Sequence, residues 1–141
     1  AGRLPPLQNP KRAARGAVMA IDQATRASLE LLKAQSGARE GSLLAAVDRT
    51  VTGAGARALA QRLSAPLTDP GAINARLDAA GFLAANDRLR DAVRTELRGM
   101  PDLARALSRL SLDRGGPRDL AAIGEGLTRA RALAGCFARE T

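Results

Sequence analysis

The sequence predicts an all-α fold, a bundle of about six or seven helices with room for one short strand near the N-terminus. The 141 residues include no Trp, no Tyr and only two Phe, so leucine and alanine must fill the core. These residues suit closely packed helices, and few aromatic or β-branched residues are left for strands. A chain of this length buries roughly 68–70% of the surface that its unfolded form exposes, which is enough for one core.

The first 17 residues are predicted to be a linker from a preceding domain, and residues 18–141 to form the helical domain. Prolines interrupt the linker and prevent a helix from propagating. Residues 17–21 are apolar and fit either a brief strand or an extended lead into the core. The chain begins with Ala, without an initiator Met, which suggests a piece of a longer protein.

The first helix is predicted to begin after Asp22, a good N-cap, and to continue to about residue 35. Arg26 and Glu30 are expected to pair on its surface, because residues four apart are neighbours on a helix. Its predicted inward residues are Leu29 and Leu32.

The clearest helix signal lies between Thr52 and Pro66. Thr52 is a good N-cap, and Pro66 both lacks a backbone donor and pushes Ala65 out of the helical region. Between them an apolar stripe recurs at helical spacing, made of Ala56, Leu59, Ala60 and Leu63. A short helix is expected just before, over residues 42–47, and it should bury Leu43, Leu44 and Val47.

Four further helices are delimited by capping residues, proline and glycine. They are predicted to run from Pro70 to about Ala85, from Asn86–Asp87 to Gly99, from Pro101 to the break at Asp113–Gly116, and from Pro117 onward. The predicted inward residues are Ile73, Leu77 and Ala80, then Leu89, Val93 and Leu97, then Leu103, Leu107 and Leu110, and finally Leu120, Ile123 and Leu127. Arg105 and Arg109 should point outward. Glycines at 124, 126 and 135 should weaken the last helix by roughly 1 kcal/mol each, unless a neighbour packs closely there.

The formal net charge of +8 invites a nucleic-acid or anionic-membrane partner. The arginines, however, are scattered along the chain and often stand near Asp or Glu at helical spacing, which is typical of solvated helix faces. No aromatic residues are interleaved with them, so stacking on single-stranded bases is disfavoured. A solvated surface is therefore favoured over a dedicated phosphate-binding face, which stays open as the alternative.

The residues needed for most catalytic sites are missing. There is no histidine and only one cysteine, Cys136, which excludes Ser-His-Asp, Cys-His and cysteine-based zinc sites. The glycines at 53 and 55 lack the Gly-Lys-Ser/Thr of a P-loop, so a backbone turn is favoured over anion binding. No apolar run approaches the roughly 20 residues needed to cross a bilayer. We expect a non-catalytic helical module, in a reducing, cytoplasmic setting and away from membranes.

The carboxylates near predicted helix starts are read as caps. They are Asp22, Asp69, Asp87 and Asp119.

Three blocks of sequence, in order, carry a resemblance. Residues 20–31 resemble the segment that opens the core or lever domain, domain III, of the bacterial MutS family of DNA mismatch-repair proteins. Residues 41–78 and 102–120 resemble the next two blocks. Ser28, Arg62 and Ala104 depart from the residues that are frequent in the family. The positions that carry the family pattern, with an expected structural role, are Asp22, Thr25, Leu29, Glu30, Asp48, Thr50, Thr52, Gly55, Arg57, Pro66, Arg76, Asp102, Arg105, Pro117, Arg118 and Asp119.

The resemblance implies a dimeric parent protein that binds mismatched double-stranded DNA, hydrolyses ATP with Mg²⁺ and recruits MutL. This chain has neither a Walker A sequence nor a Phe-x-Glu wedge, so no catalytic, cofactor or metal site is expected in it. It would be the first part of the lever, in contact with the connector, clamp and ATPase domains of the same chain. Residues 1–17 would arrive from the connector domain.

The implied mechanism is mechanical, because a packed helical element can carry displacement from the ATPase to the clamp. Arg49, Arg57, Arg118 and Asp119 are expected either to hold turns and interdomain contacts or only to cap and solubilise helices. The alternative function is an autonomous basic helical module that binds nucleic-acid phosphates directly.

Overall fold

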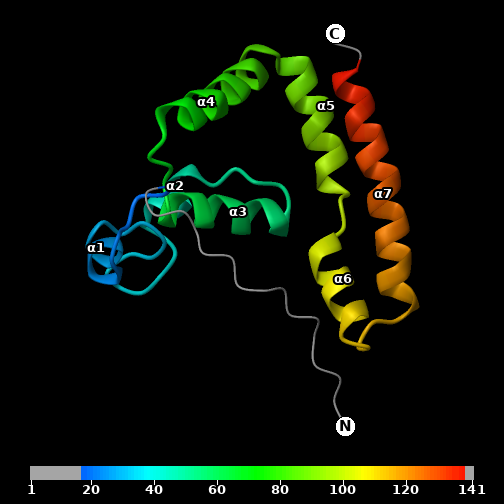
Figure 1. Ribbon diagram of the computed structural model, residues 1–141, viewed down its shortest axis with the longest axis horizontal. Coiled ribbons are helices and arrows are strands. Elements are labelled where there is room, and N and C mark those ends of the chain that lie inside the picture. The colour runs from blue at the N-terminus through cyan, green and yellow to red at the C-terminus, as the bar shows by residue number, and fades with distance from the viewer. Residues whose placement is uncertain (1–16, 139–141) are drawn as a thin grey trace. The chain divides into compact units, whose positions relative to one another are not determined.

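The computed structural model describes residues 17–138, and these are mainly helical, which confirms the predicted all-α fold (Figure 1). The helices of this described part are α1 (Gln23–Ser28), α2 (Leu43–Val47), α3 (Gly53–Ser64), α4 (Pro70–Ala85), α5 (Asp87–Arg98), α6 (Leu103–Ser111) and α7 (Pro117–Phe137). They fall into two compact units, an N-terminal unit that ends at Phe82 and a C-terminal unit that begins at Leu83. All of the predicted linker except residue 17 lies outside the described residues, so the linker remains a prediction.

The apolar run at residues 17–21 forms an extended lead. Val18 makes an isolated antiparallel bridge with Leu67, and the Met19 amide donates to the Pro66 carbonyl at 2.7 Å. Within residues 17–138 this bridge takes the place of the predicted short strand. Val18 and Met19 are thereby connected to the segment that follows α3.

Helix α1 begins as predicted and ends early. The Asp22 carboxylate accepts from the Thr25 amide at 2.7 Å and from its hydroxyl at 2.9 Å. The expected end at residue 35 is wrong, because Glu30 has a positive φ of 49° that leaves the helical region. The Glu30 carboxylate accepts from the Gln35 amide at 2.6 Å instead of pairing with Arg26.

The physical reason for the early end lies in α2. The carbonyls of Glu30 and Leu31 accept from the amides of Leu43 and Leu44 at 3.0 and 2.9 Å, so long-range hydrogen bonds replace further helical ones. Leu31 is buried, whereas Leu29, predicted to point inward, is 58% exposed. The hydrogen bonds to α2 therefore determine which residues of this segment are buried.

The short helix α2 lies where it was predicted, and only part of its predicted burial is correct. Leu44 is buried, but Leu43 and Val47 are exposed, because a five-residue helix offers one narrow face. Helix α3 follows its prediction closely. The Thr52 hydroxyl accepts from the Gly55 amide at 2.9 Å, and the helix ends at Ser64 before the proline.

Helix α4 has its predicted bounds but not its predicted face. The Asp69 carboxylate caps it by accepting from the Ala72 amide at 2.7 Å. Ile73 is half-buried, but Leu77 is 62% exposed and Ala80 is exposed as well. The reason is visible in the sequence of α4, where alanines and other apolar residues occur on all sides, so no single stripe is directed inward.

In the C-terminal unit, α5 and α6 follow one another along the longer α7 (Figure 1). The 21 residues of α7 equal the 12 of α5 and the nine of α6 together, so one helix supports both. The buried side of this unit consists of Leu89, Val93, Ala106, Asp119 and Gly126.

The predicted inward faces of α6 and α7 are only partly correct, since Leu103, Leu110 and Ile123 are half-buried but the other three leucines are not. Leu107, Leu120 and Leu127 are 56%, 65% and 64% exposed, whereas Ala106 and Gly126 are buried. A shift of one residue turns a helix by about 100°, and small residues at the contact let helix backbones approach closely. Helix α6 also starts two residues after Pro101, because Asp102 caps it. The Asn86 side chain does not cap α5.

Close packing at Gly126 generates a test of this register. A Cβ at Gly126 would lie 2.9 Å from Leu103 Cγ, whereas a Cβ at Gly124 would meet nothing within 4 Å. Gly126→Ala is expected to lower the free energy of unfolding by about 1–3 kcal/mol through overpacking. Gly124→Ala in the same helix should raise it by about 0.5–1 kcal/mol. Urea denaturation measures both, and changes of equal sign would contradict the register.

Candidate functional site

Two carboxylates organise the polar contacts between consecutive elements, one in each unit. Asp48 does so in the N-terminal unit and Asp119 in the C-terminal unit. We call Arg39, Asp48 and Thr50 the Asp48 junction, and Arg109, Gly116 and Asp119 the Asp119 junction.

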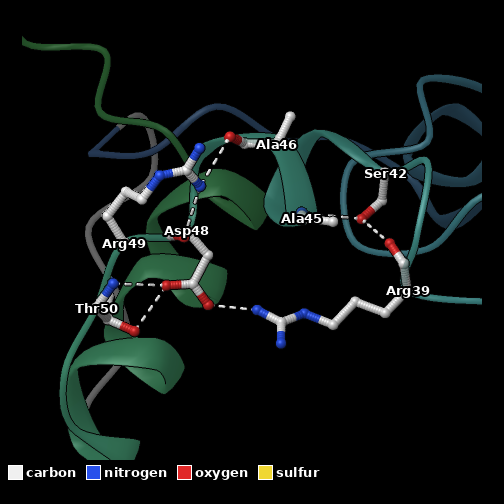
Figure 2. Close-up of polar contacts among 7 residues, drawn as sticks. All are labelled: Arg39, Ser42, Ala45, Ala46, Asp48, Arg49 and Thr50. Atoms are coloured by element: carbon white, nitrogen blue, oxygen red, sulfur yellow. Dashed lines mark hydrogen bonds and ion pairs between the residues drawn. The ribbon is translucent and has the colours of Figure 1, made fainter.

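The Asp48 junction ties the loop before α2 to the turn that enters α3 (Figure 2). Asp48 Oδ1 accepts from the Thr50 amide at 2.8 Å and from its hydroxyl at 2.7 Å, and Oδ2 pairs with the Arg39 guanidinium. The Asp48 side chain is only 12% exposed. The Thr50 hydrogen bonds and, after them, Arg39 lower the pKa of Asp48 below its ordinary value. Asp48 therefore remains a charged acceptor near neutral pH.

Both ends of α2 are closed by neighbouring side chains (Figure 2). Ser42, which is fully buried, donates its hydroxyl to the Arg39 carbonyl at 2.6 Å and accepts from the Ala45 amide at 3.2 Å. At the other end, Arg49 Nη1 donates to the carbonyls of Ala46 and Asp48 at 3.3 and 2.9 Å. Such closure satisfies backbone groups that a short helix leaves open.

The Asp119 junction joins α6 to the first turn of α7. Asp119 is 9% exposed; its Oδ2 accepts from the Gly116 amide at 3.1 Å, and its Oδ1 accepts from Arg109 Nε at 2.8 Å. Arg109 Nη2 pairs with the same oxygen. Arg109, predicted to point outward, is half exposed and yet directs its guanidinium to the junction.

The charges of this junction stabilise one another. The Arg109 hydrogen bonds, followed by that from Gly116, lower the pKa of Asp119, and Asp119 in turn raises the pKa of Arg109. Gly115 lies where the turn between the helices is tightest, since a Cβ there would be 2.8 Å from the Leu110 Cα. The junction therefore fixes the turn as well as the ion pair.

The structure brings together several residues that the sequence singled out, in short-range pairs. Asp22 binds Thr25, Asp48 binds Thr50, Thr52 binds Gly55, and Asp102 pairs with Arg105 at 3.4 Å. Pro66 accepts from residue 19, and Pro117 begins α7. Leu29 and Glu30 lie beyond the end of α1. Arg57, Arg76 and Arg118 are exposed on α3, α4 and α7, outside both junctions.

Sequence reasoning missed Arg39 and Ser42, and it missed the role of Arg109. Arg39 pairs with Asp48 nine residues away, and Arg109 pairs with Asp119 ten residues away, across a change of element. No helical or strand periodicity links positions nine or ten residues apart. The only indication in the sequence is a charged residue close to the end of a predicted helix or loop.

The side chains of both junctions form hydrogen bonds and ion pairs that connect neighbouring elements. All buried side-chain nitrogen and oxygen atoms in residues 17–138 have a hydrogen-bond partner. In the same range no three His, Cys, Asp or Glu side chains gather as a metal site would require. The Cys136 thiol donates to the Ala132 carbonyl at 3.5 Å. None of the helices described combines the length and the apolar character needed to cross a membrane.

The lowered pKa of Asp119 predicts a pH dependence of stability. In the folded chain this carboxylate stays deprotonated at pH values below its ordinary pKa of 3.8. Its contribution to the free energy of unfolding is therefore complete above about pH 5 and is lost as the pH falls through the pKa of the folded state. Asp119→Asn should therefore lower the unfolding temperature at pH 7 and have a shrinking effect toward pH 3. Thermal unfolding followed by circular dichroism from pH 7 to pH 3 measures this. Asp91→Asn, an exposed carboxylate of α5, is the control, and an effect of Asp119→Asn that is constant with pH would contradict the junction.

Comparison with known proteins matches the chain over most of its length. The family described as MutS domain III covers residues 24–141. The DNA mismatch repair protein MutS of Azorhizobium caulinodans is 57% identical over 140 residues, which are 99% of this chain and 15% of the relative. The proteins of the same name from Rhodopseudomonas palustris strain BisA53 and Caulobacter sp. strain K31 are 59% and 58% identical, over 99% and 96% of this chain and 16% and 15% of their own lengths.

The chain therefore spans about 15% of the length of the curated relatives that it matches. Within that span the match includes both junctions and every helix from α2 to α7. This helical chain, held together by the Asp48 and Asp119 junctions, belongs to the MutS domain III family.

Proposed function

We propose that the chain is a non-catalytic lever segment of a longer DNA mismatch-repair protein, in which it transmits conformational change between the ATPase, connector and clamp domains. The relatives are named as DNA mismatch repair proteins, and this chain covers a small part of each. The longer protein would dimerise, bind mismatched double-stranded DNA in the cytoplasm and recruit MutL. Since this sequence has no Gly-x-x-x-x-Gly-Lys-Ser/Thr, ATP and Mg²⁺ would bind outside it.

The observation that carries the proposal is the way α7 holds α5 and α6. The Asp119 junction closes one end of the α6–α7 pair, and Leu103 of α6 packs directly on Gly126 of α7. Close-packed elements with few voids transmit displacement instead of absorbing it. A lever needs this property, because both of the sites that it connects must bias one packed element.

The distribution of charge supports the lever over a basic nucleic-acid module. A phosphate-binding face would gather unpaired arginines on one side of the chain. Instead, ion pairs with carboxylates engage arginines in the loop before α2 and in α5, α6 and α7, namely Arg39, Arg90, Arg105, Arg109 and Arg129. These five pairs are distributed over four segments of the chain and occur in both units.

The four residues singled out for turns or interdomain contacts divide by geometry. Arg49 and Asp119 contact the ends of helices within the chain. Arg57 and Arg118 have exposed side chains, and we assign them to contacts with other domains of the longer protein. If Arg57→Ala left ATPase–DNA coupling unchanged in the full-length protein, that assignment would be wrong for Arg57.

Breaking the Asp119 junction in the full-length protein tests transmission. Arg109→Ala is expected to leave binding to a G·T mispair without nucleotide nearly unchanged and to slow the ATP-triggered release from that DNA by roughly tenfold, as for a coupling loss of about 1.4 kcal/mol. Stopped-flow release of a labelled duplex measures it. Arg88→Ala, an exposed arginine of α5, should release normally. Normal release by a folded Arg109→Ala protein would refute the lever.

A duplex titration of this chain separates the lever from the basic module. The lever predicts weak binding that fades from low to physiological salt and ignores a G·T mispair, because only phosphates attract the arginines. Fluorescence anisotropy with a homoduplex and the mispaired duplex measures both affinities. Tight, mispair-selective binding at physiological salt would instead establish the chain as a DNA-reading module.

A further inference from the structure

The joint between α5 and α6, residues 99–102, has few backbone hydrogen bonds. Helix α5 ends at Arg98 with Gly99 as its C-cap, and Pro101, two residues on, has no amide to donate. The amides of Met100 and Leu103 bond only to carbonyls two or three residues back, at 3.0 and 2.9 Å. A segment with so few hydrogen bonds opens locally at low free-energy cost unless another element holds it.

Arg129 of α7 is the side chain that lies over this joint. Its Nε donates to Glu125 on its own helix at 3.0 Å, and its Nη1 lies 4.0 Å from a carboxylate oxygen of Glu96 in the last turn of α5. A Cβ at Gly99 would come within 2.6 Å of Arg129 Nη2, so the guanidinium covers the C-cap. One side chain thereby connects the end of α5, the joint and α7.

The backbone of Gly99 does not by itself require glycine. Its φ of −89° and ψ of −1° are open to any L-residue. A side chain at this position would meet the guanidinium of Arg129, which would have to move aside. Glycine at position 99 therefore lets the guanidinium lie directly over the C-cap, and a larger residue would displace it.

We propose that Arg129, with Glu96, Glu125 and Gly99, forms a clasp that makes α5 and α6 move as one body. Without the clasp the two helices bend at residues 99–102. This proposal rests on the proposed lever function. If the chain is a lever, the clasp determines whether a displacement of α5 also moves α6 or only bends the joint between them. Arg129 acts as a positioning residue, since its contacts are with Glu96, Glu125 and Gly99.

Amide hydrogen exchange of the full-length protein, followed by mass spectrometry on peptides covering residues 97–103, tests the clasp. Arg129→Ala and Gly99→Ala should each speed exchange there by roughly fivefold, as expected for losing two partly exposed ion pairs. In the Arg129→Ala background, Gly99→Ala should add nothing or slow exchange, because alanine fits the freed helical conformation better than glycine. This reversal is specific to the clasp.

Conservative and control variants sharpen the test. Arg129→Lys should give an intermediate rate, because an ammonium lacks the planar fork that reaches both carboxylates. Arg131→Ala, an exposed arginine of the same helix, should leave residues 97–103 unchanged. Peptides over residues 109–119, held by the Asp119 junction, are the internal reference and should stay protected.

The outcomes separate the clasp from the lever. Unchanged exchange at residues 97–103, additive effects of the two substitutions, or equal loss of protection at residues 109–119 would overturn the clasp. Faster exchange at the joint together with unchanged ATP-triggered release would support the clasp and count against the lever. Faster exchange with slowed release would support both.

Discussion

The ion pair between Arg109 and Asp119 is the interaction on which the C-terminal unit depends. A carboxylate that is 9% exposed is costly unless charged or polar donors surround it. Arg109 supplies two donors from α6, and the Gly116 amide supplies a third at the start of α7. Because all three come from the two elements that meet at this turn, satisfying the carboxylate also fixes how α6 and α7 run past one another.

Small residues and glycine determine how closely the helices then approach. Leu103 packs where Gly126 has no side chain, and Arg129 lies where Gly99 has none. The two glycines thus receive different side chains, the apolar Leu103 of α6 at Gly126 and the charged Arg129 of α7 at Gly99. The Asp119 junction and the contact at Gly126 fix α6 on α7, so bending within this unit would begin at the α5–α6 joint. The packing of the unit is in this way connected to its proposed mechanical function.

The N-terminal unit is held together differently. Its helices α1 and α2 are six and five residues long, and they bury few apolar side chains. Order there comes from caps and from polar contacts. Ser42 and Arg49 close the ends of α2, and Asp48 binds the loop before it and the turn after it. In both units the charged groups serve as connections between elements, which fits membership of a family domain whose relatives belong to a much longer repair protein.

The sequence by itself determined where most helices begin. Asp22, Thr52, Asp69 and Pro117 mark starts that the structure reproduces, because a cap is decided by hydrogen bonds within three residues. Its family pattern also identified the family. Only the tertiary structure decided that α1 ends at Ser28, that Ala106 and Gly126 rather than the neighbouring leucines face the core, and that Arg39 and Arg109 reach their carboxylates. Each of these depends on a partner nine or more residues away, and helical spacing carries no information about which partner that will be.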